Sequence, residues 1–250
     1  MPVLGVIPAR LHSTRLPRKP LQALAGIPLV VRVAQRVAAL GLLDELVIAT
    51  DSEEVGAVVQ EAGFRVELTN PGHQSGTDRV AEVARRAAYR RFDMIANVQG
   101  DEPFLPSGAL RGALGRVAGG DDIGTAAAPL LAEHAADPDR VKVVTDLQGR
   151  ALYFSRAVIP HCRDLGDAER GLYWQHLGVY AFSRPALERW ATLEPTALEQ
   201  AERLEQLRAL QHGLTIGVAR LGEPAHPGVD TPDDLRRAEA HWHATPEIPA

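Results

Sequence analysis

Short runs of apolar residues recur through the first hundred positions, and stretches with helical spacing lie between them. Four runs are typical of strands buried on both faces of a sheet: 3–7, 45–50, 64–68 and 94–98. Between them, Pro28 is predicted to open an amphipathic helix, and Thr77 or Asp78 is predicted to cap another that runs to about Arg90. Strands that alternate with helices in this way predict βαβ units and a mostly parallel sheet.

The second half of the chain has several strand-like runs with less helical sequence between them. These runs are 123–130, 141–145, 151–155, 177–182 and 215–219. Glu199–His212 has strong helical periodicity and is predicted to be one helix. Thr231-Pro-Asp-Asp predicts the start of a last helix, because it supplies a cap, a proline at the first position and acids in the first turn. The expected fold class is α/β, with mixed strands and a small lobe in the second half.

Charge is distributed unevenly along the chain. The formal net charge is −5, which argues against a nucleic-acid-binding protein, where a basic face is expected. Yet no Asp or Glu precedes Asp44, whereas the same segment holds several basic residues: Arg10, Arg15, Arg18, Lys19, Arg32 and Arg36. An acidic protein with a basic first segment is expected to bind an anion there.

Several classes of protein are excluded by what the sequence lacks. The single cysteine, Cys162, cannot form an intramolecular disulfide or a structural zinc site, and we expect a protein of the reducing cytoplasm. No run of about 18 apolar residues is present, so we expect no membrane span. The patterns H-E-x-x-H and G-x-S-x-G are absent, and Cys162 lies in no nucleophile motif. A covalent mechanism therefore has little support.

The basic residues are concentrated in the loop Ala9–Pro20, which follows the first predicted strand. This loop contains neither a P-loop nor a dinucleotide-binding glycine pattern. Arginine nevertheless presents a planar fork to phosphate oxygens, and lysine adds a compact charge. Ligands of open parallel sheets bind beyond the carboxyl ends of the strands. The loop is therefore a candidate polyphosphate site, and the alternative is a solvated basic loop.

Two acidic segments are candidates for a magnesium site. Asn97-Val-Gln-Gly-Asp-Glu-Pro103 places Asp101 after a predicted strand, and Mg²⁺ binds one or two carboxylates together with phosphate oxygens and water. Asp230 precedes the predicted cap, is not needed for capping, and could be a second ligand of the same ion. The following Asp233 and Asp234 are expected to complement the helix dipole. An ordinary Asp-rich turn is the alternative for the first segment.

The remaining candidates are weaker. His73-Gln-Ser-Gly-Thr-Asp-Arg79 offers small residues before a helix start, whose backbone N–H groups can bind an anion or the edge of a base. A capped helix without a ligand explains this segment as well. Arg156, His176, Glu202 and Glu205 are uninformative alone, and the two glutamates are expected to face solvent on an amphipathic helix.

Nine short motifs follow one another along nearly the whole chain, among them Ile7-Pro-Ala-Arg, His73-Gln-Ser-Gly-Thr and Asn97-Val-Gln-Gly-Asp-Glu-Pro. They lie within 7–21, 49–51, 73–77, 97–103, 141–144, 151–156, 176–180, 204–208 and 228–232. In this order they resemble the CMP-Kdo synthetase family, the 3-deoxy-manno-octulosonate cytidylyltransferases. Kdo stands for 3-deoxy-manno-octulosonate, an acidic eight-carbon sugar.

The resemblance implies a Rossmann-like nucleotidyltransferase domain over residues 1–250. A smaller mixed-strand lobe within about 145–190 would serve homodimerisation. The implied enzyme is cytoplasmic, joins CTP to Kdo, releases pyrophosphate and uses Mg²⁺, and its product CMP-Kdo serves the synthesis of lipopolysaccharide-type glycans. Neither nucleic acid nor membrane is an expected partner.

The resemblance also implies a role for each matching residue. Four residues are implied to be catalytic, with the two acids as Mg²⁺ ligands: Arg10, Lys19, Asp101 and Asp230. The implied nucleotide-binding residues are Ala9, Arg10, Arg15, Lys19, Ser75, Gly76, Arg79 and Gly100. The implied sugar-binding residues are Gln99, Arg156, His176, Glu205 and Gln206.

Two positions depart from the family pattern. Arg18 stands where the family usually has glycine, so a positive φ there would strain the loop, although the side chain could point outward or contact a phosphate. Asp78 stands where the family tends to have glutamate. Neither change removes an expected ligand.

Two other kinds of function stay open at this point. CMP-sialic acid and CMP-8-amino-Kdo synthetases would use the same basic loop and acids, and only the later motifs 151–156 and 204–208 favour Kdo. The alternative from another class is a non-catalytic nucleotide-binding module on the same fold. Lys19, Asp101 and Asp230 argue against it, because a protein without turnover has no chemical need for them.

Overall fold

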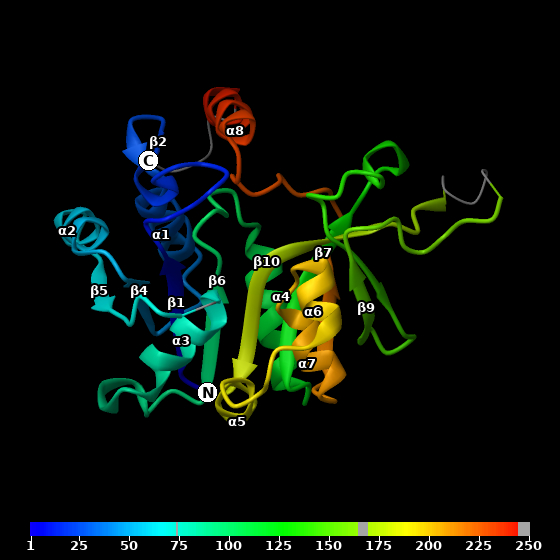
Figure 1. Cartoon of the computed structure of the whole chain (residues 1–250), viewed down its shortest axis with the longest axis horizontal. Coiled ribbons are helices and arrows are strands. Elements are labelled where there is room, and N and C mark those ends of the chain that lie inside the picture. Colours follow the sequence, from blue (N-terminus) through cyan, green and yellow to red (C-terminus); the bar gives the residue numbers. More distant parts are fainter. Residues whose placement is uncertain (74, 165–169, 245–250) are drawn as a thin grey trace. The chain divides into compact units, whose positions relative to one another are not determined.

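The computed structural model describes residues 1–73, 75–164 and 170–244, and the chain divides into two compact units. The first unit comprises residues 1–105 and the chain from 226 onwards, and the second comprises residues 106–225. The α/β fold class is confirmed, because the first unit holds parallel strands and the second unit holds strands of both directions (Figure 1).

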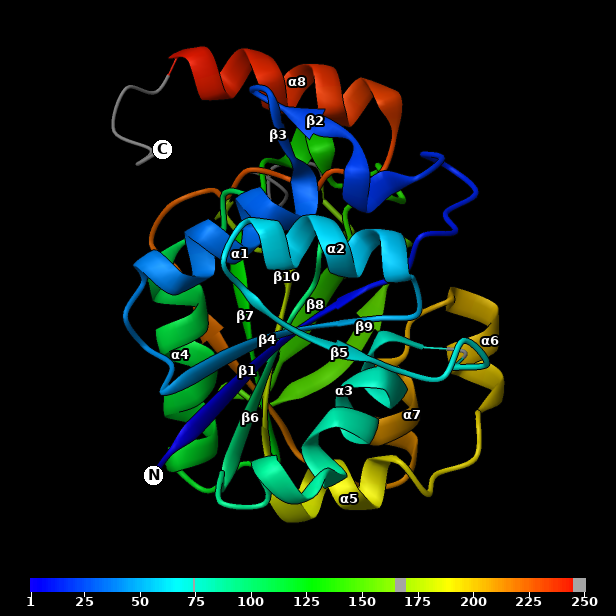
Figure 2. The same ribbon diagram turned by 90° about the vertical axis from the view of Figure 1, so that its left-hand side faces the viewer.

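A parallel sheet in the order β6–β1–β4–β5 forms the core of the first unit. Its strands can be followed in Figure 2: β1 (Val3–Ala9), β4 (Glu45–Thr50), β5 (Arg65–Leu68) and β6 (Met94–Val98). Every residue of β6 is buried, and so are all but one of β1. The runs that form β1 and β6 and most of β4 are therefore buried on both faces, as predicted. The run 64–68 differs: β5 is the edge strand of this sheet and none of its residues is fully buried, because only one neighbouring strand covers it.

Helices and a short hairpin accompany this sheet. They are η1 (Lys19–Leu21), β2 (Ala23–Leu24), β3 (Ile27–Pro28), α1 (Leu29–Ala39), α2 (Glu53–Glu61), α3 (Gly76–Arg85), η2 (Ala87–Tyr89) and α8 (Pro232–Ala244). Figure 2 shows α8 lying along the β2–β3 hairpin. There the backbone N–H of Ala25 donates to Glu239 Oε2 over 2.8 Å, and the Arg32 guanidinium lies 4.1 Å from the ring centroid of Trp242. These contacts hold the last helix against the start of the chain.

The second unit is built on a long strand, β10 (Trp174–Ser183), which pairs antiparallel with β7 (Ile123–Pro129) and β8 (Lys142–Thr145). β11 (Ile216–Arg220) joins β7 in parallel, and β9 (Ala151–Ser155) joins β8 in the antiparallel direction. The helices of this unit are α4 (Ser107–Ala118), η3 (Ala132–His134), α5 (Arg184–Trp190), α6 (Ala197–Glu202) and α7 (Gln206–Gln211). The mixed strands expected here are thus present.

The lobe predicted within about 145–190 falls inside this second unit, and its residues 165–169 lie outside the described part of the chain. Its use in homodimerisation stays a prediction. None of the described helices has the length and apolar character needed to cross a membrane.

Two helix starts differ from the prediction. α1 begins at Leu29 rather than at Pro28, because Pro28 still pairs with Ala23 in the hairpin and occupies the cap position. α3 is capped by Ser75, not by Thr77 or Asp78: the Asp78 N–H donates to Ser75 Oγ over 3.0 Å. The cap position requires extended backbone, which Ser75 has, whereas the next residues are already helical. The same helix ends at Arg85, and η2 follows it.

The single helix expected over 199–212 is wrong, because α6 and α7 are separated at Arg203, whose φ is 55°. A buried ion pair spans this break: the Arg208 guanidinium donates to both oxygens of Glu199 over 2.8 and 2.6 Å. The pattern also failed to indicate α4, whose glycines lower helix propensity. Gly112 is needed there, because a Cβ would collide with the Cβ of Ala219 on β11.

Candidate active site

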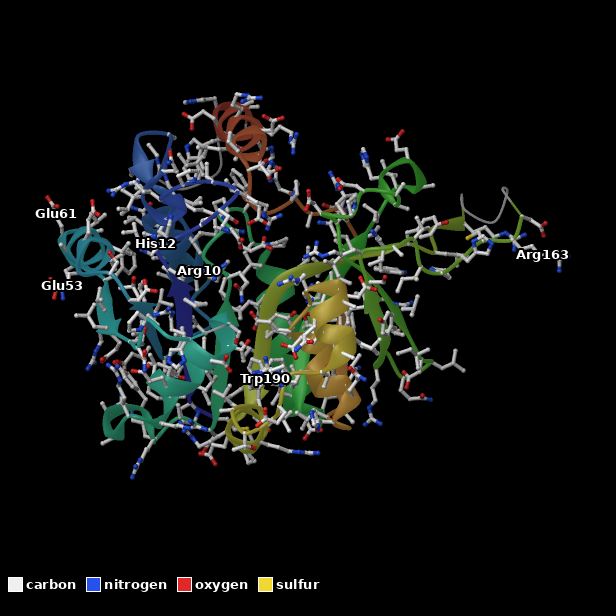
Figure 3. All side chains as sticks on the ribbon, in the orientation of Figure 1. Arg10, His12, Glu53, Glu61, Arg163 and Trp190 are labelled. Atoms are coloured by element: carbon white, nitrogen blue, oxygen red, sulfur yellow. The ribbon has the colours of Figure 1, made fainter. Side chains whose placement is uncertain are left out.

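The loop after β1 begins where the parallel strands β1 and β4 end together. Ala9 is buried and lies opposite Thr50 in the register, while Arg10 is exposed beyond the end of β1 (Figure 3). The Leu11 N–H donates to Asp51 Oδ1 over 3.4 Å, so the residue after β4 holds the first turn of the loop. The predicted phosphate loop therefore starts at the carboxyl edge of the sheet, where ligands of such sheets bind.

Lys19 joins two carboxylates that come from distant parts of the sequence. Its Nζ donates to Asp101 Oδ2 over 2.7 Å and to Asp230 Oδ1 over 2.9 Å. The side chain of Arg15 contacts the other oxygen of Asp230 at 2.8 Å. The Lys19 and Asp101 side chains are only 18% and 20% exposed, so these charges interact more strongly than a surface pair would.

The charge state of Lys19 follows from this arrangement. Burial by itself lowers the pKa of its ammonium, but the adjacent carboxylates of Asp101 and Asp230 outweigh that effect and raise the pKa above its usual value. Lys19 is therefore a fixed cation at neutral pH. Three residues assigned separately as a phosphate ligand and two metal ligands thus form one cluster.

Backbone contacts set the positions of the two acids. The Val229 N–H donates to the Asp101 carbonyl over 2.9 Å, which ties the segment before α8 to the loop after β6. Gly228 eases this approach, because a Cβ there would lie 3.3 Å from the same carbonyl oxygen, which is tighter than an ordinary contact. Asp234, expected only to complement the helix dipole, also accepts the N–H groups of Asp230 and Thr231, over 3.2 and 2.8 Å.

Hydrogen bonds also set the charge of Asp234. Burial alone raises the pKa of its carboxyl group, but the bonds from Thr231 and from the Asp230 N–H lower the pKa below its usual value. Asp234 is thus ionised and anchors the turn that carries Asp230.

Two predicted nucleotide-binding positions, Gly100 and Gly76, lie close to the end of β1. A Cβ on Gly100 would lie 3.0 Å from the Pro8 carbonyl oxygen. A Cβ on Gly76 would lie 3.3 Å from the Pro8 ring and 3.5 Å from the Gln99 side-chain amide. A side chain at position 100 would therefore crowd the Pro8 carbonyl, and glycine allows a close approach at Gly76, next to the cap residue Ser75. Their contact with a nucleotide stays a prediction.

Arg79 is placed differently from the other predicted nucleotide-binding residues. It is buried, and its guanidinium donates to Asp51 Oδ2 over 2.9 Å and to Thr69 Oγ1. Asp51 is the residue whose other oxygen accepts the Leu11 N–H. Arg79 therefore supports the start of the phosphate loop through Asp51, and a direct contact with the nucleotide stays a prediction. Asp51 belongs to the motif Ala49-Thr-Asp, for which the sequence alone indicated no role.

Arg18 has the conformation that glycine would occupy without strain. Its φ is 54° and its ψ is 35°, in the left-handed region, and its exposed guanidinium pairs with Glu54 on α2. The positive φ that would strain a non-glycine residue is therefore present at Arg18. The side chain points outward and pairs with Glu54, which is the first of the two placements expected for it. Left-handed backbone costs a non-glycine residue about 1–2 kcal/mol.

Arg18→Gly is expected to stabilise the protein by about 0.5–1 kcal/mol, because relief of the backbone strain exceeds the loss of an exposed ion pair. For a chain of this size the melting temperature should rise by roughly 1–4 °C in a thermal unfolding experiment. Arg18→Ala is the matched control, since it removes the contact with Glu54 but keeps the strained backbone. A melting temperature of Arg18→Gly at or below that of Arg18→Ala would contradict the strain argument.

The predicted sugar-binding residues lie on separate elements. Gln99 belongs to the first unit, beside Gly76. In the second unit, Arg156 follows β9, His176 lies on β10, and Glu205 and Gln206 form the start of α7. Burial raises the pKa of Tyr180 on β10 well above its usual value, and the negative charge of Glu205 raises it further. The charge of Glu205 therefore acts on Tyr180, and α7 itself packs against β9.

His176 is a neutral hydrogen-bonding group. Burial lowers the pKa of its imidazole to about 3, so it carries no charge at neutral pH. Thr125 Oγ1 lies 3.0 Å from Nε2 and donates its single proton to the Val179 carbonyl over 2.7 Å. Nε2 must then be the protonated nitrogen that donates to Thr125, which leaves Nδ1 as an acceptor.

The expectation that Glu202 faces solvent is wrong. Its carboxylate accepts the Ser155 hydroxyl over 2.6 Å and the Arg156 N–H over 2.9 Å. Helical spacing places Glu202 on a polar face but does not show that the end of β9 covers this face. Glu205, the other glutamate expected in solvent, is half-buried, and its charge acts on Tyr180 of β10.

The acids near Lys19 suit a magnesium ion by number and type. Within residues 1–73, 75–164 and 170–244, no group of three or more His, Cys, Asp or Glu side chains is arranged to hold a metal. Mg²⁺ does not require such a group, because it uses one or two carboxylates and completes its octahedron with water and phosphate oxygens. Asp101 and Asp230, which converge on one cation, fit this donor set.

Comparison with known proteins shows the family to which the chain is similar. A family model described as cytidylyltransferase matches residues 4–216. The chain is 54% identical to the 3-deoxy-manno-octulosonate cytidylyltransferase of Gemmatimonas aurantiaca, over 97% of this chain and 95% of the relative. It is 45% identical to the enzyme of the same name from Polynucleobacter necessarius, over 94% and 93%.

A solved structure is similar over the same extent. It is described as CMP:2-keto-3-deoxy-manno-octonic acid synthetase complexed with CTP. The TM-score is 0.89 at 36% sequence identity, and the match covers 98% of this chain and 99% of that one.

Proposed function

The chain belongs to the cytidylyltransferase family, and we propose that it transfers CMP from CTP to Kdo with release of pyrophosphate. The observation that carries this proposal is the cluster in which Lys19 joins Asp101 and Asp230 beside the basic loop. Such a cluster combines cations for a polyphosphate with acids for its metal, which is what transfer of a nucleotidyl group requires.

The reaction exchanges one phosphorus–oxygen bond for another. The 2-hydroxyl oxygen of the sugar forms a bond to the α-phosphorus of CTP, and the bond from that phosphorus to the bridging oxygen of the β-phosphate breaks. The electron pair leaves with pyrophosphate, and the hydroxyl proton passes to solvent. Positioning and charge stabilisation account for most catalysis of such transfers.

The basic residues of the first unit are proposed to bind the triphosphate. Lys19, Arg10 and Arg15 would stabilise the negative charge that builds up on the leaving pyrophosphate. Lys19 is suited to this task because it stays protonated and is held by two acids rather than by solvent. Arg10 is exposed at the start of the loop and can orient freely toward a phosphate.

Magnesium is proposed as the cofactor, held by Asp101 and Asp230. When bound, it would neutralise charge on the phosphate oxygens and lower the pKa of the sugar hydroxyl. The two acids need no side-chain movement to converge, because Lys19 already holds them together.

The second unit is proposed to recognise the sugar acid. Arg156 would pair with its carboxylate, since a guanidinium matches the two oxygens of that group. His176 would accept a sugar hydroxyl through Nδ1, the nitrogen left as an acceptor by the contact with Thr125. Glu205, whose charge acts on Tyr180, and Gln206, the first residue of α7, would bind further hydroxyl groups.

A homodimer in the cytoplasm is a further part of the proposal. Leu147, Leu152 and Leu172 are exposed within the predicted lobe, by 100%, 62% and 42%, and a second copy of the chain would cover such apolar surface. Sedimentation equilibrium would show a single species of one chain's mass if this assignment is wrong.

The function is tested by release of pyrophosphate from CTP and Mg²⁺ with three sugars in parallel: Kdo, its 8-amino analogue and sialic acid. Release with Kdo alone is expected. Release with another sugar instead would keep the reaction class and overturn the sugar assignment. Binding of CTP without release in any mixture would favour the non-catalytic nucleotide-binding module.

A further inference from the structure

Lys142 is a fully buried cation for which the reaction provides no role. It lies on β8, within the motif Val141-Lys-Val-Val, and has no exposed surface. Its Nζ donates to two backbone carbonyls, that of Asp137 over 2.9 Å and that of Arg156 over 2.6 Å. A buried ammonium is costly unless its hydrogen bonds are made, so these carbonyls must stay in place around it.

Glu202 holds the same arginine from the other side. Its carboxylate accepts the Arg156 N–H over 2.9 Å, and its backbone carbonyl accepts Arg156 Nε over 2.8 Å. The carboxylate is held in turn by the Ser155 hydroxyl at 2.6 Å. Glu202 ends α6, so the break between α6 and α7 brings both of its acceptor groups to the end of β9.

The segment after η3 provides the remaining contact. The Pro138 carbonyl accepts Arg156 Nη1 over 2.9 Å, and the neighbouring carbonyl of Asp137 is one of the two that Lys142 binds. Lys142 therefore connects the chain at 137–138 with the chain at Arg156.

These contacts fix the guanidinium in orientation. The backbone N–H, the backbone carbonyl, Nε and Nη1 of Arg156 each have a protein partner. Because the guanidinium is planar, fixing Nε and Nη1 also fixes the direction of the Nη2 donors. A long side chain held in this way loses little further conformational freedom when a ligand binds.

We propose that Lys142 and Glu202 are positioning residues, which hold Arg156 in the one orientation that binds the carboxylate of the sugar acid. The inference rests on the proposed function, because it takes the ligand of Arg156 from there. It gives a role to a buried lysine whose Nζ donates to two backbone carbonyls, and to a glutamate turned inward from a short helix.

Steady-state kinetics with CTP and Kdo give the first test. Glu202→Ala and Lys142→Met are each expected to raise the KM for Kdo at least about tenfold, since misplacement of a binding group by 1 Å can cost up to about a hundredfold. The KM for CTP should stay within about twofold. Glu202→Gln should restore most of the affinity for Kdo, because it still offers an acceptor to the Arg156 N–H. Unchanged KM values for Kdo in both variants would overturn the proposal.

A matched control separates positioning from general damage. Asp121 is also a buried carboxylate of the second unit, paired with Arg116 over 2.7 Å and with Arg150 over 2.8 Å. Asp121→Asn should lower the melting temperature but leave the KM for Kdo within about twofold. An equal rise of KM in Asp121→Asn and Glu202→Ala would mean that loss of stability alone explains the effect, and the proposal would fail.

A double-mutant cycle tests whether Glu202 acts through Arg156. In an Arg156→Ala background, Glu202→Ala is expected to change the KM for Kdo by less than about twofold, because the group it positions is gone. The same fold-change in both backgrounds would rule out a positioning role.

One readout needs no substrate at all. The Arg156 Nε–H proton should exchange slowly with water in the wild-type protein and at least about ten times faster in Lys142→Met and Glu202→Ala, as measured by nitrogen-15 NMR. Unchanged exchange would overturn the positioning of Arg156 even if the enzyme is fully active. Faster exchange in a protein that turns over no acidic sugar would instead support the positioning and refute the proposed function.

Discussion

Lys19→Met is expected to lower kcat for pyrophosphate release by about 10²–10³-fold. This is the usual cost of removing one fixed donor from the charge that develops in a transition state. Methionine matches the length of the lysine stem but leaves Asp101 and Asp230 without the cation that both now contact, at 2.7 and 2.9 Å. Repulsion between the two acids should also lower the melting temperature when Mg²⁺ is absent.

Arg15→Met is the matched control for this prediction. Arg15 also contacts Asp230, at 2.8 Å, but its side chain is 47% exposed, whereas that of Lys19 is 18% exposed. Its loss should lower kcat by no more than about tenfold, because exposed charges are screened by solvent. A kcat for Lys19→Met within tenfold of the wild-type value would show that Lys19 is not a catalytic cation.

Asp101→Asn and Asp230→Asn are each expected to lower kcat by about 10²–10³-fold at saturating Mg²⁺, because each removes a charge that faces the reacting phosphates. A neutral amide is also a poorer ligand for Mg²⁺ than a carboxylate. The concentration of Mg²⁺ needed for half-maximal activity should therefore rise at least about tenfold. In Lys19→Met this concentration should not rise, since both carboxylates remain; the two sets of variants thus separate metal binding from the contact with lysine.

Asp233→Asn serves as the charge-matched control for the two acids. Asp233 lies in the first turn of α8, three residues after Asp230, and its 64% exposed side chain pairs with Arg236 on the same helix. Its removal should leave both kcat and the requirement for Mg²⁺ unchanged. Near-normal turnover in Asp101→Asn and Asp230→Asn together would refute the assignment of the metal ligands.

The strands of the first unit were predictable from local pattern. β1, β4 and β6 are buried on both faces, so each had to be a continuous apolar run, and β6 matches its predicted bounds at both ends. The candidate acids and cations could also be named, because residues after parallel strands share one edge of a sheet. Chemistry that depends on residue type and on strand ends is therefore recorded in the sequence.

Contacts between distant residues could not be predicted in the same way. Lys19 and Asp230 are 211 positions apart, and no local pattern shows that one ammonium joins Asp230 to Asp101. Arg79 was implied to bind the nucleotide, and no local pattern showed that its guanidinium is buried against Asp51.

The same limit explains the error at Glu202. Helical spacing over 199–212 predicted one continuous helix with glutamates in solvent, whereas the Glu199–Arg208 ion pair accompanies a break at Arg203 that turns Glu202 toward Arg156. Periodicity reports which side of a helix is polar, because it depends only on neighbouring residues. It does not report what packs on that side, because the partners come from other parts of the chain and are chosen by the free energy of the whole fold.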